Sequence, residues 1–456
     1  MDISRRSLIN ATAAGAAAGA LTATPERAQA APLMSTLGRD AAQYGVRPNS
    51  PDDQTRALQK AIDAAANAQV PLALPPGTYR TGPLRLPNGA QLVGVRGASI
   101  LKFTGGSSLL GSEGASGLAI TNLTLDGGAI KLEDRRGLLH FLSGLDIRIQ
   151  DCDIVGSGGN GIWLENIAGE ISGNTIRKTM NTAVTSFDAL GLLVAHNTIQ
   201  DTSDNGIEIL RNAPGHDGSI VVNNRIEDIK DGPGGSGQYG NAINAVRANN
   251  VIISGNRIRN CDFTGVRGNS ASNIQILGNS VSNVQEVALY SEFAFEGAVI
   301  ANNTVDVCAT GVSVANFNEG GRIATVHGNI IRNMLPRRTV GTAPAADAGI
   351  GIVIEADAAV TGNVIENAPM FGILAGWGRY LRDVSITGNV VRNAAIGIGV
   401  SAVPDAGTAL VGNNLISGSS RAAIAGLDHA KVITEDLGAQ GASRLAQIVL
   451  GVNAIR

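Results

Sequence analysis

Five side chains that suit sugar recognition recur at one position of a repeated sequence unit: Trp163, Glu208, Asn244, Arg267 and Tyr290. Aromatic rings stack on sugar faces, amides bond to hydroxyl groups, and an arginine pairs with a carboxylate. The set therefore suits an acidic oligosaccharide, although the solvated polar face of a repeat protein would look the same. If the protein is an enzyme, we expect Asp204, Glu208, Arg267 and Tyr290 to be catalytic, and Trp163 and Asn244 to bind substrate. Beta-elimination is then the expected reaction, with Arg267 or Tyr290 taking the proton.

A loop histidine and three aspartates lie near this set in the sequence. His216 is a candidate substrate-binding or acid/base residue, although a lone loop histidine is also common on ordinary surfaces. Asp201 and Asp228 both lie four residues after a repeated asparagine, so we expect them to be stacked neighbours. With Asp204 they form a candidate Ca²⁺ site. A lysine and an asparagine at the flanking positions favour a plain surface instead.

The repeated unit has the pattern apolar–x–(Gly/Asn/His)–Asn–x–(Ile/Val) and dominates the chain from about Asp151. Its anchoring asparagines are Asn174, Asn197, Asn224, Asn256, Asn279, Asn303, Asn329, Asn363, Asn389 and Asn414. The residues three before and two after each anchor are all β-branched, which favours strands. The spacing of the anchors never falls below 23 residues, and longer spacings indicate insertions such as Arg211–Gly218 and Lys230–Gly240.

Three short strands per repeat, joined by turns, predict a parallel β-helix whose coils stack about 4.8 Å apart. We expect each anchoring asparagine to take the left-handed backbone conformation of a sharp turn. Its side-chain amide should then bond to the next anchor along the stack. A leucine-rich horseshoe is the main alternative, but its leucine pattern is absent. An antiparallel sandwich would not repeat one asparagine so regularly.

The same register aligns one outward position of every coil into a continuous line, here called the strip. Its members are Trp163, Thr185, Glu208, Asn244, Arg267, Tyr290 and Ser313, followed by Val353, Leu374 and Gly399. The polar part should be roughly 20 Å long or more. We expect the insertions Arg211–Gly218 and Lys230–Gly240 to wall it.

Composition agrees with a stack of small coils. The 456 residues are 44% hydrophobic but only 3% aromatic, and 59 are glycine. The formal charge of −3 argues against a nucleic-acid-binding protein. No apolar run is long enough for a stable membrane span in the mature protein. Three cysteines are present, and since Cys261 and Cys308 fall two coils apart, we expect all three to be free, mostly buried thiols.

Residues 1–30 resemble a twin-arginine export signal. Arg5 and Arg6 precede a mildly apolar Ala/Gly-rich stretch, and Ala28-Gln29-Ala30 has the small-x-small pattern of a cleavage site. The resemblance implies that the twin-arginine export machinery carries the folded protein. It also implies cleavage near Ala30 and a periplasmic or secreted location.

The segment after the signal carries a second resemblance. Asp52-Asp53 should cap a helix that runs to about Ala68, buries Leu58, Ala61, Ile62 and Ala65, and covers the open end of the stack. This segment contains Tyr44-Gly45-Val46, Asp52-Asp53-Gln54-Thr55, Ala57-Leu58-Gln59-Lys60-Ala61-Ile62 and Leu74-Pro75-Pro76-Gly77-Thr78-Tyr79. Together they look like the opening module of pectate-lyase-like proteins. The whole chain also resembles twin-arginine-exported repeat proteins of that superfamily, whose activity is unsettled. The family implies a right-handed parallel β-helix and, often, work on polysaccharides.

The predicted fold class is therefore all-β, a right-handed parallel β-helix with an N-terminal capping helix. The expected boundaries are 1–30 for the signal peptide, 31–110 for the N-terminal cap and first coils, 111–426 for the repeats, and 427–456 for a C-terminal cap. Within the last part, the segment from Arg444 to Val452 is expected to cover the far end.

Polygalacturonase-like members of the superfamily would carry acids just before the Gly-Ile-x-Ile strand of successive coils. The matching residues here are Asn160, Asp204-Asn205 and Asn241, so only Asp204 is a carboxylate. Hydrolysis by that mechanism needs several carboxylates and is not expected. The Asp-Pro-His signature of alginate-type epimerases is also absent.

Two functions stay open from the sequence. The first is an exported protein that binds or cleaves an extracytoplasmic, acidic polysaccharide, as a lyase if it is catalytic. The second is a non-catalytic carbohydrate-binding or cell-envelope scaffold protein. Fold alone does not decide between them.

Overall fold

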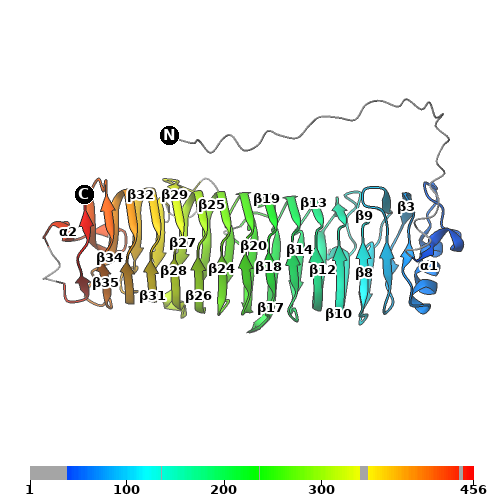
Figure 1. Cartoon of the computed structure of the whole chain (residues 1–456), viewed down its shortest axis with the longest axis horizontal. Helices are drawn as coiled ribbons and strands as arrows, with labels where there is room; N and C mark the ends of the chain where they lie inside the picture. Colours follow the sequence, from blue (N-terminus) through cyan, green and yellow to red (C-terminus); the bar gives the residue numbers. More distant parts are fainter. Residues whose placement is uncertain (1–37, 135, 236, 339–347, 441–444) are drawn as a thin grey trace, which may run out of the picture.

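This computed structural model describes residues 38–134, 136–235, 237–338, 348–440 and 445–456. The chain forms a long parallel solenoid, with its N-terminal helix at one end and its C-terminal strands at the other (Figure 1). The expected signal sequence, residues 1–30, lies outside the described residues. Within the described ranges, every helix is too short or too polar to span a bilayer.

Each complete coil contributes strands to three faces, and neighbouring coils pair in parallel. The strip face contains β4 (Leu84–Arg85), β7 (Leu110–Glu113), β10 (Gly137–Gln150), β12 (Asn160–Ser172), β14 (Val184–Phe187), β17 (Ile207–His216), β20 (Ile243–Asn249), β23 (Val266–Asn269), β25 (Ser280–Glu292), β27 (Thr304–Val314), β30 (Ile350–Ile354), β32 (Val364–Ala375), β34 (Val390–Ser401) and β37 (Ala422–Asp428). The anchor face, which follows each anchoring asparagine, contains β3 (Gly77–Thr81), β6 (Ser99–Phe103), β9 (Thr124–Asp126), β11 (Asp153–Val155), β13 (Thr175–Thr179), β16 (Thr198–Thr202), β19 (Arg225–Ile229), β22 (Arg257–Cys261), β29 (Ile330–Met334), β36 (Leu415–Ser417), β40 (Ala454–Ile455) and the first residues of β25, β27, β32 and β34.

The third face, which precedes each anchoring asparagine, completes the coil. It contains β1 (Arg39–Asp40), β2 (Leu72–Ala73), β5 (Gln91–Val93), β8 (Leu118–Thr121), β15 (Leu193–Ala195), β18 (Ile220–Val222), β21 (Ile252–Ser254), β24 (Ile274–Leu277), β26 (Glu296–Ala301), β28 (Arg322–His327), β31 (Ala356–Thr361), β33 (Arg382–Thr387), β35 (Ala409–Gly412), β39 (Ile448–Leu450) and the last residues of β10 and β12. From β12 to β36, two residues always separate a third-face strand from the next anchor-face strand. This turn therefore has one length throughout the repeats.

The asparagine ladder predicted from the sequence is confirmed. Oδ1 of Asn279 accepts both the backbone N–H and the side-chain amide of Asn256, each at 3.0 Å. The side-chain amide of Asn279 in turn donates to Oδ1 of Asn303 and to the carbonyl of Ile253, both at 3.0 Å. The same pattern runs from Asn174 to Asn414. Each buried amide thus finds partners, which removes the cost of burying it unpaired.

The expected backbone conformation of the anchors is wrong by one position. The left-handed residue is the one just before each anchor, for example His196 at φ 58° and Asn223 at φ 57°. The anchors themselves are absent from the positive-φ residues of the described chain. Glycine or asparagine fills this position in most coils because few other residues tolerate a left-handed backbone. This explains the Gly/Asn/His preference in the repeated pattern.

Small aliphatic side chains fill the interior between the three faces. Every β-branched residue two after an anchor, such as Ile199 and Ile331, is buried. All three cysteines are free and buried, as predicted. Cys261 and Cys308 pair in turn with Val284, which puts them two coils apart. Cys152 occupies the anchor position of its own coil, because its backbone N–H donates to Oδ1 of Asn174 at 2.9 Å.

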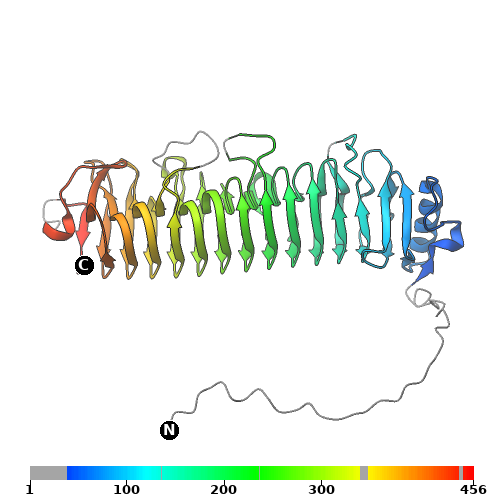
Figure 2. The same cartoon turned by 90° about the horizontal axis from the view of Figure 1, so that it is seen from above.

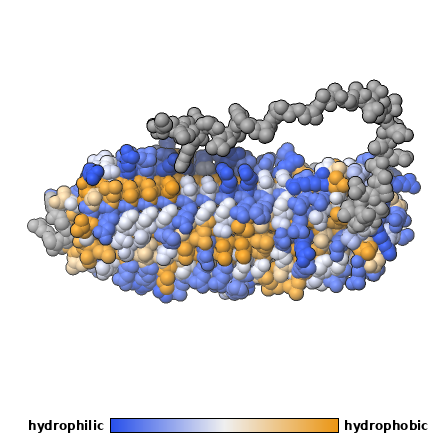
Figure 3. All heavy atoms as spheres, viewed as in Figure 1, coloured by the Kyte–Doolittle hydropathy of each residue, from blue (hydrophilic) through white to orange (hydrophobic). Residues whose placement is uncertain are grey.

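Outward positions also align along the axis. Ile330, Val364, Val390 and Leu415 pair in succession on the anchor face. Such alignment produces the lines of hydrophobic residues that run along the molecule in Figure 3. One position of the repeat therefore makes one continuous surface feature.

The two ends differ in how they close the stack. Helix α1 (Thr55–Asn67) lies at the N-terminal end and buries Leu58, Ala61 and Ile62, as predicted. It begins two residues after Asp53, whose Oδ1 accepts the Thr55 N–H at 2.9 Å. Short 3-10 turns η2 (Ala41–Tyr44) and η3 (Phe317–Glu319) lie outside the strands.

At the C-terminal end, Arg444 of the predicted cap lies outside the described residues, and the described part forms a hairpin, a short helix and two further strands. β38 (Lys431–Val432) folds back on β37 as an antiparallel hairpin, and α2 (Leu437–Gln440) follows. Then β39 and β40 pair in parallel with β35 and β36, so the chain resumes the coil. Asn453 extends the ladder, since its Oδ1 accepts the Asn414 amide at 3.0 Å. Asn453 follows Asn414 by 39 residues, so the spacing of the repeated pattern does not reveal it as an anchor.

Candidate functional site

The strip has the register that the sequence predicts. Its members pair one with the next, from Trp163 to Thr185, Glu208, Asn244, Arg267, Tyr290 and Ser313, and on to Val353, Leu374 and Gly399. One residue extends it toward the N-terminus, because His140 pairs with Trp163. The repeated pattern does not reveal His140, because no anchoring asparagine precedes it.

The strip is more deeply buried than an outward position of a solenoid should be. Asn244 is only 6% exposed, and the Arg267 side chain is 11% exposed. The insertion Lys230–Gly240 covers part of the strip. Its Gln238 carbonyl accepts the Asn205 amide at 3.2 Å, and its Gly237 carbonyl accepts an Arg267 N–H. Figure 2 shows such connecting segments extending from one long side of the solenoid, including the one between β19 and β20.

Two carboxylates of the predicted set come together on this face. The side-chain amide of Asn205 donates to Glu208 at 2.9 Å and to Asp204 at 3.4 Å. Glu208 also accepts the hydroxyl protons of Thr182 at 3.2 Å and Thr185 at 3.1 Å. Asp204 is buried, while Glu208 keeps part of its surface exposed. This gives a pair of acids in different surroundings.

The two acids differ in how their charged forms are supported. Burial, then the nearby Glu208 and Asp231 carboxylates, raise the pKa of Asp204 to about 7. Burial also raises the pKa of Glu208, but hydrogen bonds from Thr185, Thr182 and Asn205 favour its ionised form. Burial and neighbouring carboxylates thus favour the protonated form of Asp204, while three hydrogen bonds support the charged form of Glu208.

Asparagines at the positions that resemble polygalacturonase acids form a second, shorter ladder. Oδ1 of Asn160 accepts the Thr182 backbone N–H at 3.0 Å. Oδ1 of Asn205 accepts the backbone N–H of Asn241 at 2.9 Å and its side-chain amide at 3.0 Å. All three asparagines are buried. They hold the turn before the strip strand, and Asn205 also orients the acid pair.

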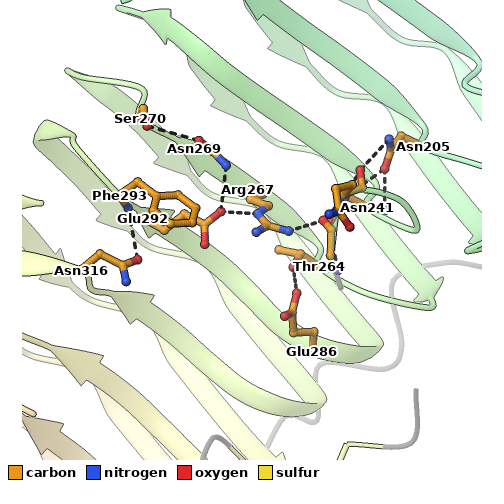
Figure 4. Close-up of polar contacts among 12 residues, drawn as sticks. Asn205, Asn241, Thr264, Arg267, Asn269, Ser270, Glu286, Glu292, Phe293 and Asn316 are labelled. Atoms are coloured by element: carbon orange, nitrogen blue, oxygen red, sulfur yellow. Dashed lines mark hydrogen bonds and ion pairs between the residues drawn. The ribbon is translucent and has the colours of Figure 1, made fainter. Parts of the chain in front are cut away.

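Arg267 is held by the buried carboxylate of Glu292 (Figure 4). Arg267 forms an ion pair with Glu292 at 2.5 Å and lies 5.6 Å from the centre of the Tyr290 ring. Despite its burial, the Glu292 carboxylate holds the pKa of Arg267 above its ordinary value. Burial, then Glu292 and Glu286, raise the pKa of Tyr290. Both shifts favour the protonated forms, and the expected role of Arg267 or Tyr290 as the base stays an untested prediction.

The remaining predicted residues lie at the edges of this site. Trp163 is half-buried, with its ring 5.3 Å from that of Phe187 and its Nε1 donating to Glu165 at 2.7 Å. His216 is exposed at the far end of β17, where its Nδ1 lies 2.8 Å from Asn250. His216 pairs with Asn249, after the register of β17 and β20 shifts between Leu210 and Gly215. The fold therefore does not bring His216 next to Glu208.

The three aspartates of the candidate calcium site do not converge. Asp201 and Asp228 do occupy equivalent, left-handed positions of neighbouring coils. Asp228 accepts the Asn260 side-chain amide at 3.0 Å, whereas Asp204 shares the Asn205 side-chain amide with Glu208. Across the described ranges, no three His, Cys, Asp or Glu side chains are placed to hold a metal ion. Calcium binding stays an untested prediction from the sequence.

A cavity of about 250 Å³ opens farther along the strip. Tyr290, Ser313 and Val353 of the strip line it, together with Glu355 and Trp377. The sequence offers no repeated signal for the last two residues, because neither lies on the strip position. Several lining residues flank the insertions that follow β27, β29 and β32.

Comparisons with known proteins agree with this fold. The A-module of mannuronan C-5 epimerase AlgE6 from Azotobacter vinelandii is 17% identical, with a TM-score of 0.52, over 77% of this chain and 98% of that module. The pre-mature gene product 12 of bacteriophage phi29 is 13% identical, with a TM-score of 0.50, over 83% of this chain and 64% of that chain. At such identities the likeness shows the fold alone. Among curated proteins, none matches the sequence.

The sequence also matches a family described as "Right handed beta helix region" at residues 108–240 and 216–391. These matches span more than half of the chain and coincide with the paired coils described above. This chain therefore belongs to the right-handed β-helix region family.

Proposed function

We propose that the protein binds a polysaccharide chain along the strip and cleaves it by acid–base chemistry at Asp204 and Glu208. The observation that carries this proposal is the acid pair, joined through the Asn205 amide, with the pKa of Asp204 raised to about 7. Cleavage of a glycosidic bond needs a proton donor for the leaving sugar and a carboxylate that remains ionised. Asp204 takes the first role and Glu208 the second.

The charges of this face favour an uncharged polymer over the acidic one expected from the sequence. Arg267 is paired with Glu292 at 2.5 Å, and Arg338 with Glu286 at 2.9 Å. Both guanidinium groups are therefore already neutralised by carboxylates, while Glu208 adds negative charge. A uronate chain would be repelled by such a surface. A neutral chain offers hydroxyl groups that amides and carboxylates can bond.

The fold supports carbohydrate-related work only by analogy. A mannuronan C-5 epimerase module shares the solenoid at 17% identity, so the proposal rests on the side chains. Residues 1–30 resemble a twin-arginine signal. For this reason we propose that the protein acts in the periplasm or outside the cell.

A non-catalytic carbohydrate-binding protein is the second candidate. One observation favours it: Thr182, Thr185 and Asn205 all donate to Glu208, so this carboxylate is already well satisfied. A carboxylate held in this way orients a ligand well and reacts less readily.

The experiment is a screen of the exported protein against neutral and uronate polymers. New reducing ends report hydrolysis, and ultraviolet absorbance of unsaturated ends reports elimination. We expect reducing ends from a neutral polymer, and a loss of about 10²-fold or more in Asp204→Asn. Asp146→Asn is the matched control, since Asp146 is exposed and also has a left-handed backbone that asparagine tolerates. Binding without cleavage by the wild type would support the second candidate.

A further inference from the structure

The cavity beyond Tyr290 carries polar groups that lack the partners expected of buried groups. Glu355 is 8% exposed, and its carboxylate accepts the Phe317 backbone N–H at 2.6 Å. Within the described ranges, no ion pair joins Glu355 to a cation. Arg338 bonds to Glu286 through Nη1, but its buried Nε has no hydrogen-bond partner among the described residues. Both side chains line the cavity.

An aromatic ring completes the lining. Trp377 is half-buried, and its ring meets that of His429 edge-on, with centroids 5.2 Å apart. On the same side, Val353, Leu374 and Trp377 pack on a small apolar cluster outside the main core. The cavity thus offers one aromatic surface, the exposed part of the Arg338 guanidinium as donor and one buried acceptor. This is the combination that binds a sugar ring, whose faces are apolar and whose edge carries hydroxyl groups.

The position of the cavity relates it to the acid pair. Eight successive pairings lead along the strip from Trp163 to Leu374, three residues before Trp377. At about 4.8 Å per coil this distance is roughly 38 Å. Glu208 lies two coils from Trp163 and six from Leu374 on the same line. The chain's two tryptophans therefore lie at opposite ends of the strip, with the acid pair between them.

We propose that this cavity is a distal subsite that holds one uncharged sugar ring of the chain bound at Asp204. The assignment rests on the proposed function and deepens it. Trp377 stacks on the ring, the exposed edge of the Arg338 guanidinium donates to a ring hydroxyl, and Glu355 accepts from another. Glu286 and Glu355 outnumber the single Arg338 charge here, so the cavity rejects a sugar carboxylate. A sugar chain of about nine rings, at about one ring per coil, would reach both tryptophans.

The two tryptophans make the test direct, because each can be left as the only one. In an Asp204→Asn background, which keeps the sugar chain intact, Trp163→Phe leaves Trp377 as reporter and Trp377→Phe leaves Trp163. The probes are β-1,3- and β-1,4-gluco-oligosaccharides of two to about nine units, one ring for each coil, with oligogalacturonates as charged counterparts. Tryptophan emission and its quenching by acrylamide are measured during titration. Melting curves check that each variant is folded.

We expect neutral oligomers to protect Trp377 from quenching, and one long oligomer to protect both reporters. Affinity for the longest oligomer should be at least tenfold higher than for the shortest, and Trp377→Ala should remove that gain. Tyr380→Ala is the matched control, since Tyr380 lies in the same turn but does not line the cavity. Glu355→Gln should bring the affinity for oligogalacturonate closer to that for the neutral oligomer.

Two results would overturn the subsite and leave the proposed function standing. One is that the wild type cleaves a polymer and oligomers protect Trp163 from quenching, while the emission of Trp377 does not change with oligomers of any length. The other is tighter binding of oligogalacturonate than of neutral oligomers at Trp377. If neither reporter responds and the wild type cleaves no polymer, the proposed function fails together with the subsite.

Discussion

Arg267 and Glu292 form a 2.5 Å ion pair in which the Arg267 side chain is 11% exposed and that of Glu292 is 3% exposed. The pair lies beneath the insertion Lys230–Gly240, whose Gly237 carbonyl also accepts from Arg267. Its burial changes what an alanine substitution does. At an exposed strip position Arg267 would contribute little to stability, whereas here its loss leaves Glu292 buried and unpaired.

Arg267→Ala should therefore lower the free energy of unfolding by about 3–5 kcal/mol, the usual cost of breaking a buried ion pair from one side. Chemical denaturation of the mature protein measures it. Arg259→Ala is the control, because Arg259 pairs with Glu227 at the surface and should leave the midpoint unchanged. Equal midpoints for Arg267→Ala and wild type would mean that Arg267 is not buried.

Asn279→Leu should lower the free energy of unfolding by about 1–3 kcal/mol. It removes the acceptor of the Asn256 amide and the donors to Asn303 and Ile253, all of them buried. The measurement is the denaturation midpoint, with Ser280→Ala as control, since Ser280 is the exposed neighbour. A midpoint as high as that of wild type would remove Asn279 from the interior ladder.

Stability should fall as pH rises from about 4 to about 7, through Asp204. Its pKa is raised from 3.8 to about 7, so the folded state holds a proton that the unfolded state releases. A tenfold change in proton affinity corresponds to about 1.4 kcal/mol, so the contribution of Asp204 reaches a few kcal/mol at most. Asp204→Asn should melt at a temperature that rises relative to wild type across this range. A constant difference between the two melting curves from pH 4 to 8 would contradict the raised pKa.

Export should depend on the paired arginines near the N-terminus. Replacing Arg5 and Arg6 together by lysine should leave the precursor in the cytoplasm, because the export machinery reads the pair itself. Cell fractionation and immunoblotting measure precursor and mature forms. Normal export of the double variant would refute the signal assignment.

The sequence predicts the scaffold well because each coil repeats the same physical requirements. Asn279 needs a partner amide above and below it, and Val281 needs the interior, so ten copies set both period and register. The pairing of Glu208 with Asn244 follows from that register although the two residues are 36 positions apart in the sequence.

The chemistry of the face is less predictable, because it depends on segments that do not repeat. The burial of Arg267 comes from one insertion, and its partner Glu292 lies off the strip position. Trp377 and Glu355 occur once each, in a cavity bounded by several strands and turns. Asp204 and Glu208 are joined through the side-chain amide of Asn205. Comparison with the polygalacturonase pattern only identifies Asn205 as a residue that replaces an acid.

The constant two-residue turn at the asparagine ladder has a consequence for how such a protein can change. Extra residues between coils from β12 to β36 lie at the ends of the strip strands, as in Lys230–Gly240 before β20 and Arg211–Gly218 in the last part of β17 and just after it. Insertions and deletions there leave the ladder and the aliphatic interior intact. Lineages can therefore exchange the segments bordering the strip as modules and acquire new ligands without refolding the solenoid. Loop grafting at these two borders is the corresponding route for engineering.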